Sequence, residues 1–192
     1  PIIVETKFEN GFKVKPEDLE KNITNKTKWV IINSPGNPTG SVYSEEELRK
    51  LADVIRKYKN VFILSDDIYE HILYKNTKFT NILNISPDLF DRTFIVNGVS
   101  KVFSMTGWRI GYGAGHKDLI KSISKIQSQC TTNPCSISQM AAKFALGNEK
   151  TFLKDWLVKF EDRKNFLVDF FSSIDGFEPF IPQGAFYLYV SC

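Results

Sequence analysis

Three short apolar runs, rich in Val and Ile, alternate with helical patterns and constrain the fold more than any other feature. The runs cover residues 29–33, 61–66 and 93–98, and such continuous apolar runs are typical of strands buried on both faces of a parallel sheet. Between the first two runs, Ser44 and Glu47 form a capping box, after which apolar residues recur at helical spacing. Strand, helix and strand joined by short connections indicate a right-handed βαβ unit.

Two other segments belong with this unit. Pro16 stands at a favoured first helical position, and a polar helix is expected from there to about Ile23. The glycine-rich run 108–115 is expected to be another strand, whose glycines would let neighbouring backbone or a ligand approach closely. An α/β fold is therefore predicted for the first part of the chain.

Longer helical patterns occupy the second part. One helix is expected over residues 117–146, with a break near Asn133-Pro134, and another over 151–174 with a broad apolar stripe. The apolar run 185–190 is expected to be a strand of a further layer. We predict three parts: a main α/β domain over 1–150, a long connecting helix over 151–175, and the beginning of a small α+β domain over 176–192.

The composition excludes several classes of protein. With 42% hydrophobic and 24% charged residues and a net charge of +3, the chain is neither disordered nor collagen-like. It has no block of five or six basic residues, so nucleic acid is not expected as a partner. No apolar run approaches the roughly 20 residues of a membrane span, and residues 1–7 do not resemble a signal peptide. A soluble, cytoplasmic protein without a membrane partner is expected.

The cysteines and the chain ends add two expectations. Three cysteines and two histidines do not have the spacing of a zinc site, so no metal is expected. An odd number of cysteines fits a reducing compartment. The chain begins with Pro1 instead of Met and stops at Cys192 just after an apolar run, which suggests the central part of a longer protein.

Polar side chains follow each predicted strand, where ligands bind in open α/β sheets. Taken singly, these residues have ordinary explanations as turn residues, helix caps or solvated charges. Taken together, they suit a single ligand. They are Asn37 in an Asn-Pro-Thr-Gly turn, Asp66 and Tyr69 after the second run, and Ser100, Lys101 and Arg109 after the third.

That ligand is pyridoxal phosphate, which needs an amine for its aldehyde, an anion for its ring nitrogen, donors for its phenolic oxygen and cations for its phosphate. Lys101 offers the amine. Asp66 offers a carboxylate that would keep the pyridine nitrogen protonated. Arg109 is one of only five arginines, and a guanidinium can hold a phosphate with two hydrogen bonds.

These motifs resemble the class I and II aminotransferases, which are fold type I pyridoxal-phosphate enzymes, and within them the bacterial aspartate aminotransferase branch. The resemblance implies a mostly parallel sheet sandwiched by helices, a long interdomain helix and a small second domain. It covers essentially the whole chain. The matching segments are Asn37-Pro38-Thr39-Gly40, Asp66 with Tyr69, Ser100-Lys101, residues 105–112 and 127–129, Asn133-Pro134 and residues 183–187.

The resemblance also implies catalytic and ring-binding roles. Lys101 would form the Schiff base with the cofactor and, once displaced by substrate, would move the proton from the substrate's Cα. Asp66 would pair with the pyridine nitrogen. Tyr69 and Asn37 would hydrogen-bond the phenolic oxygen.

Three further residues have roles implied in the same way. Ser100 and Arg109 would bind the phosphate, and Phe186 would lie near the substrate. One position departs from the family, which usually has Asp-Glu where this chain has Asp66-Asp67. The spacing to Tyr69 selects Asp66, and strand alternation predicts that Asp67 points away from the ring; a one-residue slip would exchange the two.

The resemblance implies transfer of an amino group between an L-amino acid, expected to be aspartate or glutamate, and a 2-oxo acid, in a homodimer. Aromatic amino acids and arogenate or prephenate stay open as substrates. The family's phosphate-binding helix, its ring-stacking aromatic residue and its carboxylate-binding arginine have no counterpart here, so this span alone is expected to be inactive. A C–S lyase or other β-eliminating enzyme of the same fold, and a catalytically silent fragment, are the alternatives.

Overall fold

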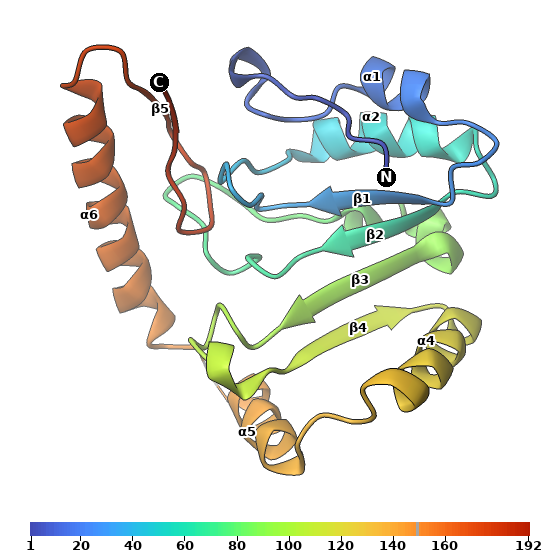
Figure 1. The fold of residues 1–192 in the computed structure, drawn as a ribbon. Coiled ribbons are helices and arrows are strands. Elements are labelled where there is room, and N and C mark those ends of the chain that lie inside the picture. The colour runs from blue at the N-terminus through green and yellow to red at the C-terminus, as the bar shows by residue number, and fades with distance from the viewer. Residues whose placement is uncertain (149) are drawn as a thin grey trace.

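A four-stranded sheet lies at the centre of the computed structural model, which describes residues 1–148 and 150–192 (Figure 1). Its strands lie in chain order: β1 (Trp29–Asn33), β2 (Phe62–Asp66), β3 (Thr93–Gly98) and β4 (Gly111–Gly115). β1, β2 and β3 are parallel, and β4 is antiparallel to β3. The predicted α/β fold is confirmed, with a mixed sheet.

The register brings the strand ends to one edge of the sheet. Asn33 lies opposite Asp66, and Asp66 lies opposite Val96. Figure 1 shows the carboxyl ends of β1, β2 and β3 pointing toward the C-terminal segment. The residues that follow these strands are therefore neighbours in space.

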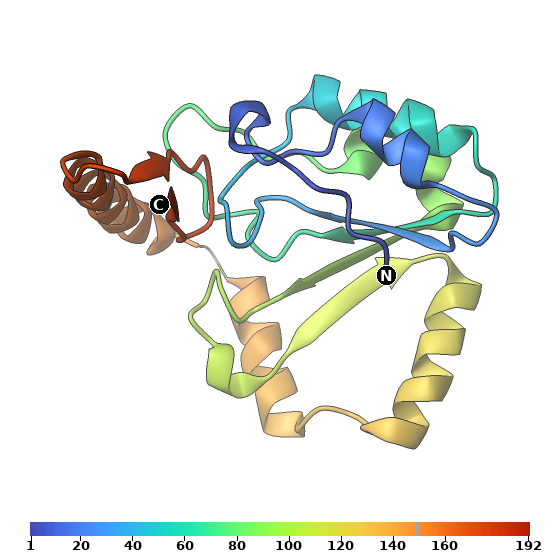
Figure 2. The same ribbon diagram turned by 45° about the horizontal axis from the view of Figure 1, so that its top comes forward.

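One face of the sheet is closed by a well-packed core. α2 (Glu45–Arg56) begins at the predicted capping box, in which Ser44 Oγ accepts from the Glu47 amide and Glu47 Oε2 accepts from the Ser44 amide. Its residues Leu48 and Ile55 are buried together with Ile63 of β2. α1 (Pro16–Asn22), α3 (Ile82–Ile85) and the 3-10 helix η2 (Pro87–Arg92) add to the same core, and Figure 2 shows these helices on one side of the sheet.

The other face of the sheet carries a smaller core. α4 (Lys117–Cys130) and α5 (Ser136–Gly147) lie on this side (Figure 2), and the predicted break at Asn133-Pro134 separates them. Val99, Ile110 and Ala142 form the buried cluster here, whereas Ile31 in the middle of β1 is 69% exposed. This face therefore contributes less to the buried core.

β4 is shorter than the strand predicted over 108–115. The 3-10 helix η3 (Thr106–Trp108) precedes it, and Arg109 has a left-handed φ of 54°, which no extended strand adopts. Glycine within β4 has a packing reason, because a Cβ on Gly113 would lie 2.3 Å from the ring of Phe94. The expected close approach is thus made by a neighbouring ring.

The C-terminal part consists of α6 (Leu153–Ser172) and an antiparallel pair, β5 (Glu178–Phe180) and β6 (Tyr189–Ser191). The strand predicted over 185–190 is wrong in extent. Ala185 has a φ of 57°, and its amide donates to the carbonyl of Ile72, so this stretch is held by another part of the chain. Only its last residues can pair with β5.

The N-terminal segment contacts this C-terminal pair. After the 3-10 helix η1 (Phe8–Asn10), the ring of Phe12 packs edge-on against Phe180 and Tyr189 at 5.3 and 5.1 Å. The division into 1–150, 151–175 and 176–192 stays a prediction, and Glu149 beside its first boundary lies outside the described residues. None of the helices in the described part of the chain is both long and apolar enough to cross a membrane.

Candidate active site

The two adjacent carboxylates at the end of β2 have different surroundings. Asp66 is partly exposed, and its Oδ1 accepts from the amide of Ile68 at 3.2 Å. Asp67 is 3% exposed and accepts from Ser65 Oγ at 2.7 Å and from Asn81 Nδ2 at 3.0 Å. Asp67 is therefore buried on the core side of the sheet and Asp66 is the more exposed of the two carboxylates, in keeping with strand alternation.

Asp67 has a structural task that the sequence did not reveal. Burial raises its pKa to about 6, although the hydrogen bonds from Ser65 and Asn81 act in the opposite direction. Asn81 in turn caps α3, because its Oδ1 accepts from the amides of Leu83 and Asn84. Asp67 thus connects the end of β2 to the start of this helix.

Tyr69 lies in an aromatic cluster. Its side chain is 3% exposed, and its ring packs edge-on against those of Phe186 and Tyr187 at 5.5 and 5.6 Å. Its hydroxyl lies 2.5 Å from the hydroxyl of Tyr187. Burial, and then the contact with Tyr187, raise the pKa of the Tyr69 phenol, so that it stays protonated at neutral pH.

Lys101 reaches the same cluster from the turn after β3. Its Nζ lies 5.8 Å from the ring centre of Tyr69 and 5.7 Å from that of Phe186, within the distance of a cation–π contact. The structure therefore brings Lys101, Tyr69 and Phe186 together, three of the residues singled out from the sequence. Phe186 comes from a segment more than eighty residues further along the chain.

The Asn-Pro-Thr-Gly turn is tied to the end of β2 by Asn33, a residue not singled out in the sequence. Asn33 Oδ1 accepts from the amide of Asn37 at 2.7 Å, and its Nδ2 donates to the carbonyl of Asp66 at 3.1 Å. Asn37 itself is exposed. A polar residue at the last position of an apolar strand was the available signal for Asn33.

Ser100 and Arg109 are brought to the same edge by the antiparallel pairing of β3 and β4. Gly98 lies opposite Gly111, and the amide of Val99 donates to the carbonyl of Ile110 at 3.3 Å. Ser100 directly follows Val99, and Arg109 directly precedes Ile110. The Arg109 guanidinium is exposed and donates to the carbonyl of Thr106 at 3.0 Å.

The segment 183–187 is held against these turns by its backbone. The amides of Gln183 and Gly184 both donate to the carbonyl of Gly40, and Gln183 Oε1 accepts from the amide of Val42. Gly40 has a φ of 72°, and a Cβ there would lie 2.4 Å from Pro182. These contacts hold the segment in which Phe186 lies near Lys101 and Tyr187 contacts Tyr69.

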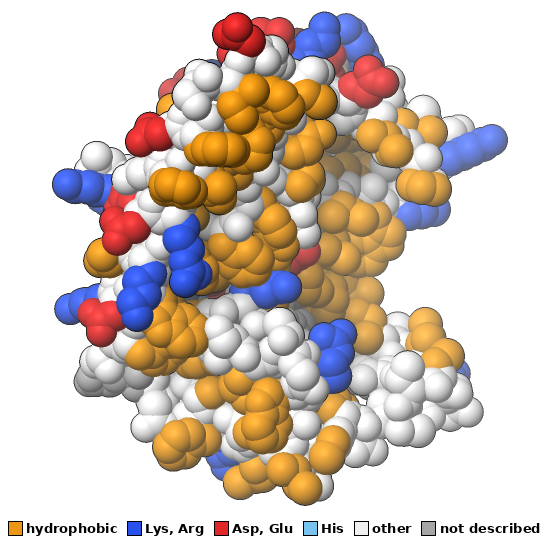
Figure 3. Space-filling view, turned by 60° about the vertical axis from the view of Figure 1, so that its left-hand side comes forward, with side chains coloured by type: hydrophobic (Ala, Val, Ile, Leu, Met, Phe, Trp, Pro, Cys, Tyr) orange, Lys and Arg blue, Asp and Glu red, His pale blue; other side chains and the backbone are white. Residues whose placement is uncertain are grey.

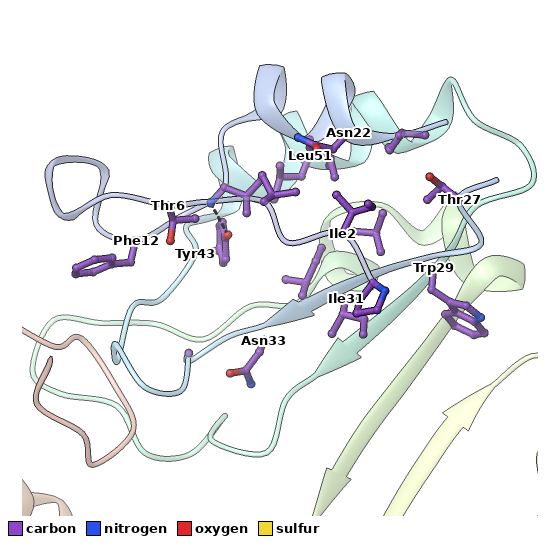
Figure 4. A pocket seen from close by; sticks show the side chains of 18 of the residues that line it. Ile2, Thr6, Phe12, Asn22, Thr27, Trp29, Ile31, Asn33, Tyr43 and Leu51 are labelled. Atoms are coloured by element: carbon purple, nitrogen blue, oxygen red, sulfur yellow. Dashed lines mark hydrogen bonds between the residues drawn. The ribbon is translucent and has the colours of Figure 1, made fainter. Parts of the chain in front are cut away.

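A cavity lies beside Asn33 and Asn37. Its volume is about 940 Å³, and it lies between the N-terminal segment and β1, reaching Asn33 and Asn37 at one end. Figure 4 shows Ile2 near Ile31, with Asn33 toward the carboxyl end of the strand. Lys101 does not line it. Figure 3, from another side, shows hydrophobic side chains around a hollow with Lys or Arg side chains at its centre.

The arrangement suits a reaction in which the Lys101 amine forms a Schiff base with an aldehyde. A lysine beside two aromatic rings, a carboxylate on the same sheet edge, phenol and amide donors, and a serine and an arginine that follow and precede the paired ends of β3 and β4 are the kinds of group that pyridoxal phosphate requires. Among residues 1–148 and 150–192, no group of three or more side chains is placed to hold a metal ion.

Comparisons with known proteins agree on one family. Residues 1–192 match the family described as aminotransferase class I and II. A Rickettsia typhi protein named probable aspartate/prephenate aminotransferase is 53% identical over all of this chain and 48% of its own length. The aspartate/prephenate aminotransferase of Nitrosomonas europaea is 47% identical over 99% of this chain and 48% of its own length.

Solved structures show the same fold. The aspartate aminotransferase of Rhizobium meliloti superimposes with a TM-score of 0.98 and 42% identity, over 100% of this chain and 48% of that one. The Thermus thermophilus aspartate aminotransferase with maleate superimposes with a TM-score of 0.91 and 38% identity, over 98% of this chain and 49% of that one. The chain spans about half the length of the relatives it matches, and the fold type I prediction is confirmed. By sequence and by fold alike, the chain belongs to the class I and II aminotransferases.

Proposed function

We propose that the carboxyl edge of the sheet binds pyridoxal phosphate and serves the transfer of an amino group between an L-amino acid and a 2-oxo acid. The observation that carries this proposal is the position of Lys101 Nζ beside the rings of Tyr69 and Phe186, 5.8 and 5.7 Å from their centres. Membership of the aminotransferase family supports the same function.

The residues at this edge fit the cofactor group by group. The Lys101 amine would bind the aldehyde, and Asp66 would bind the pyridine nitrogen through a carboxylate whose Oδ1 is already oriented by the amide of Ile68. When bound, the cofactor supplies an electron sink for negative charge at the substrate's Cα. Lys101, released by the substrate amine, would take the proton from that carbon.

The other ends of the cofactor would meet neutral and cationic donors. Tyr69, which stays protonated, and Asn37 would donate to the phenolic oxygen. Ser100 and Arg109, which lie next to the hydrogen-bonded residues Val99 and Ile110, would hold the phosphate. Phe186 would border the substrate.

Aspartate is the proposed amino donor, and prephenate a proposed acceptor, because the relatives are named for these compounds. The discriminating assay offers aspartate with 2-oxoglutarate or prephenate, and cystathionine separately. Transfer to the 2-oxo acid supports aminotransfer; pyruvate and ammonia from cystathionine, without glutamate, would favour β-elimination.

We propose negligible turnover for the 192-residue span alone, because it covers about half the length of its relatives. We also propose a homodimer, to be tested by sedimentation of the full-length protein, and a cytoplasmic location, with which three free cysteines agree.

The cofactor site is tested by trapping. The chain is incubated with pyridoxal phosphate, reduced with borohydride and mapped by peptide mass spectrometry, with the label expected on Lys101. Lys150→Ala is the matched control for Lys101→Ala, because Lys150 Nζ also lies over a ring, that of Phe103, at 5.9 Å. The control should keep the label and Lys101→Ala should lose it. Label on a different lysine would overturn the assignment.

A further inference from the structure

Tyr187 contacts the proposed site without any role assigned to it so far. Its hydroxyl lies 2.5 Å from that of Tyr69, and either oxygen could be the donor. The two rings pack edge-on, at 5.6 Å and 80°. This is a direct hydrogen bond between the C-terminal segment and the phenol expected to face the cofactor.

The position of Tyr187 is set by a rigid stretch of backbone. Ala185 is fully buried, has a left-handed φ of 57°, and donates its amide to the carbonyl of Ile72 at 2.8 Å. A Cβ on Gly184 would lie 2.8 Å from that same carbonyl oxygen and 2.9 Å from Pro35. With two tight contacts just before it, Tyr187 has little freedom to leave Tyr69.

The donor direction matters because each phenol has one proton and can also accept. If Tyr69 donates to Tyr187, its proton is used and cannot reach the cofactor. If Tyr187 donates, the proton of Tyr69 stays free, and Tyr69 becomes the stronger donor because hydrogen bonds in a chain polarise one another.

We propose that Tyr187 is a positioning residue that donates its hydroxyl proton to Tyr69 and thereby directs the proton of Tyr69 to the phenolic oxygen of pyridoxal phosphate. This proposal rests on the proposed function. The charged groups that face Tyr69 fit it. Asp66 disfavours a negative charge on Tyr69, and the ammonium of Lys101 lies over the face of its ring and leaves the hydroxyl to Tyr187.

The first test needs no cofactor. Unfolding in denaturant is compared for the unaltered chain, Tyr69→Phe, Tyr187→Phe and the double variant, since phenylalanine keeps the ring contact and removes only the hydroxyl. The double variant should lose less stability than the sum of the single losses, because both single variants remove the same bond. Additive losses would overturn the proposal. Tyr189→Phe is the matched control, since Tyr189 packs on Phe12 instead.

The second test follows the absorption of Lys101-bound pyridoxal phosphate against pH. The change in absorption with pH reports the pKa of the imine between Lys101 and the cofactor, whose proton is shared with the phenolic oxygen. A hydrogen bond donated to that oxygen lowers this pKa, so Tyr69→Phe should raise it. Tyr187→Phe should raise it less, and Tyr189→Phe should leave it unchanged. A lowered pKa in Tyr187→Phe would mean that Tyr69 donates to Tyr187. An unchanged pKa would mean that the Tyr69–Tyr187 pair does not affect the cofactor. Either result overturns the proposal. If no cofactor can be trapped on Lys101 of the unaltered chain, the proposed function fails, and the unfolding cycle alone decides the pairing of Tyr187.

Discussion

Two regions of the molecule differ in composition and backbone: the packed core between α2 and the sheet, and the carboxyl edge of the same sheet. The core consists of side chains such as Leu48, Ile55 and Ile63, each at most 1% exposed and contributed by regular helix and strand. The edge consists of polar and aromatic side chains on turns, and left-handed backbone at Gly40, Arg109 and Ala185. Buried apolar packing is concentrated in the first region, and left-handed backbone conformations in the second, where we propose that the cofactor binds.

The largest effect is expected in the core. Ile63→Ala removes a fully buried side chain and should cost about 2–5 kcal/mol of unfolding free energy. Ile31→Ala on the opposite face is the matched control and should cost far less, because its side chain is 69% exposed. Denaturant unfolding measures both. Equal losses would show that the two faces of the sheet contribute alike to stability.

Asp67, where the core meets the edge, should make stability depend on pH. Its pKa is raised from 3.8 to about 6, so the folded chain binds more protons than the unfolded chain between about pH 4 and 6. Stability should therefore fall by about 3 kcal/mol as the pH rises through this window. Asp67→Asn removes this titration and should flatten the profile measured by unfolding at several pH values. A variant with an unchanged slope would show that another group is responsible.

Gly40 tests the strained backbone of the edge. Gly40→Ala forces a Cβ to 2.4 Å from Pro182 at a φ of 72°, and should cost more than about 1 kcal/mol. It should also displace the segment that carries Phe186 and weaken cofactor trapping on Lys101. Gly147→Ala, where a Cβ meets no atom within 4 Å, is the control. If both variants behave alike, the close contact at Gly40 does not matter.

The smallest effect is expected at Asn33. Asn33→Ala removes the two hydrogen bonds that connect the turn of Asn37 to the end of β2, at a cost of about 1 kcal/mol in stability. Cofactor affinity, measured by titration of absorbance, should fall several-fold because Asn37 is less well held. Unchanged affinity with reduced stability would assign Asn33 to the fold alone.

Most of the fold could be predicted from local patterns. The runs at 29–33, 61–66 and 93–98 and the capping box at Ser44 rest on residues close in sequence, and each has its counterpart in the structure. The strand predicted over 185–190 was too long, because apolar character does not reveal the left-handed φ of Ala185. The antiparallel direction of β4 likewise had no local signal.

By itself, the sequence determined the order of strands and helices and the set of chemical groups after each strand, since periodicity, caps and turn motifs act over a few residues. Only the tertiary structure decided which groups meet. The contacts of Tyr69 with Tyr187 and of Val42 with Gln183 join residues 118 and 141 positions apart. Hydrogen bonds over such separations leave no periodic pattern in a chain, because their geometry exists only once the intervening core has packed.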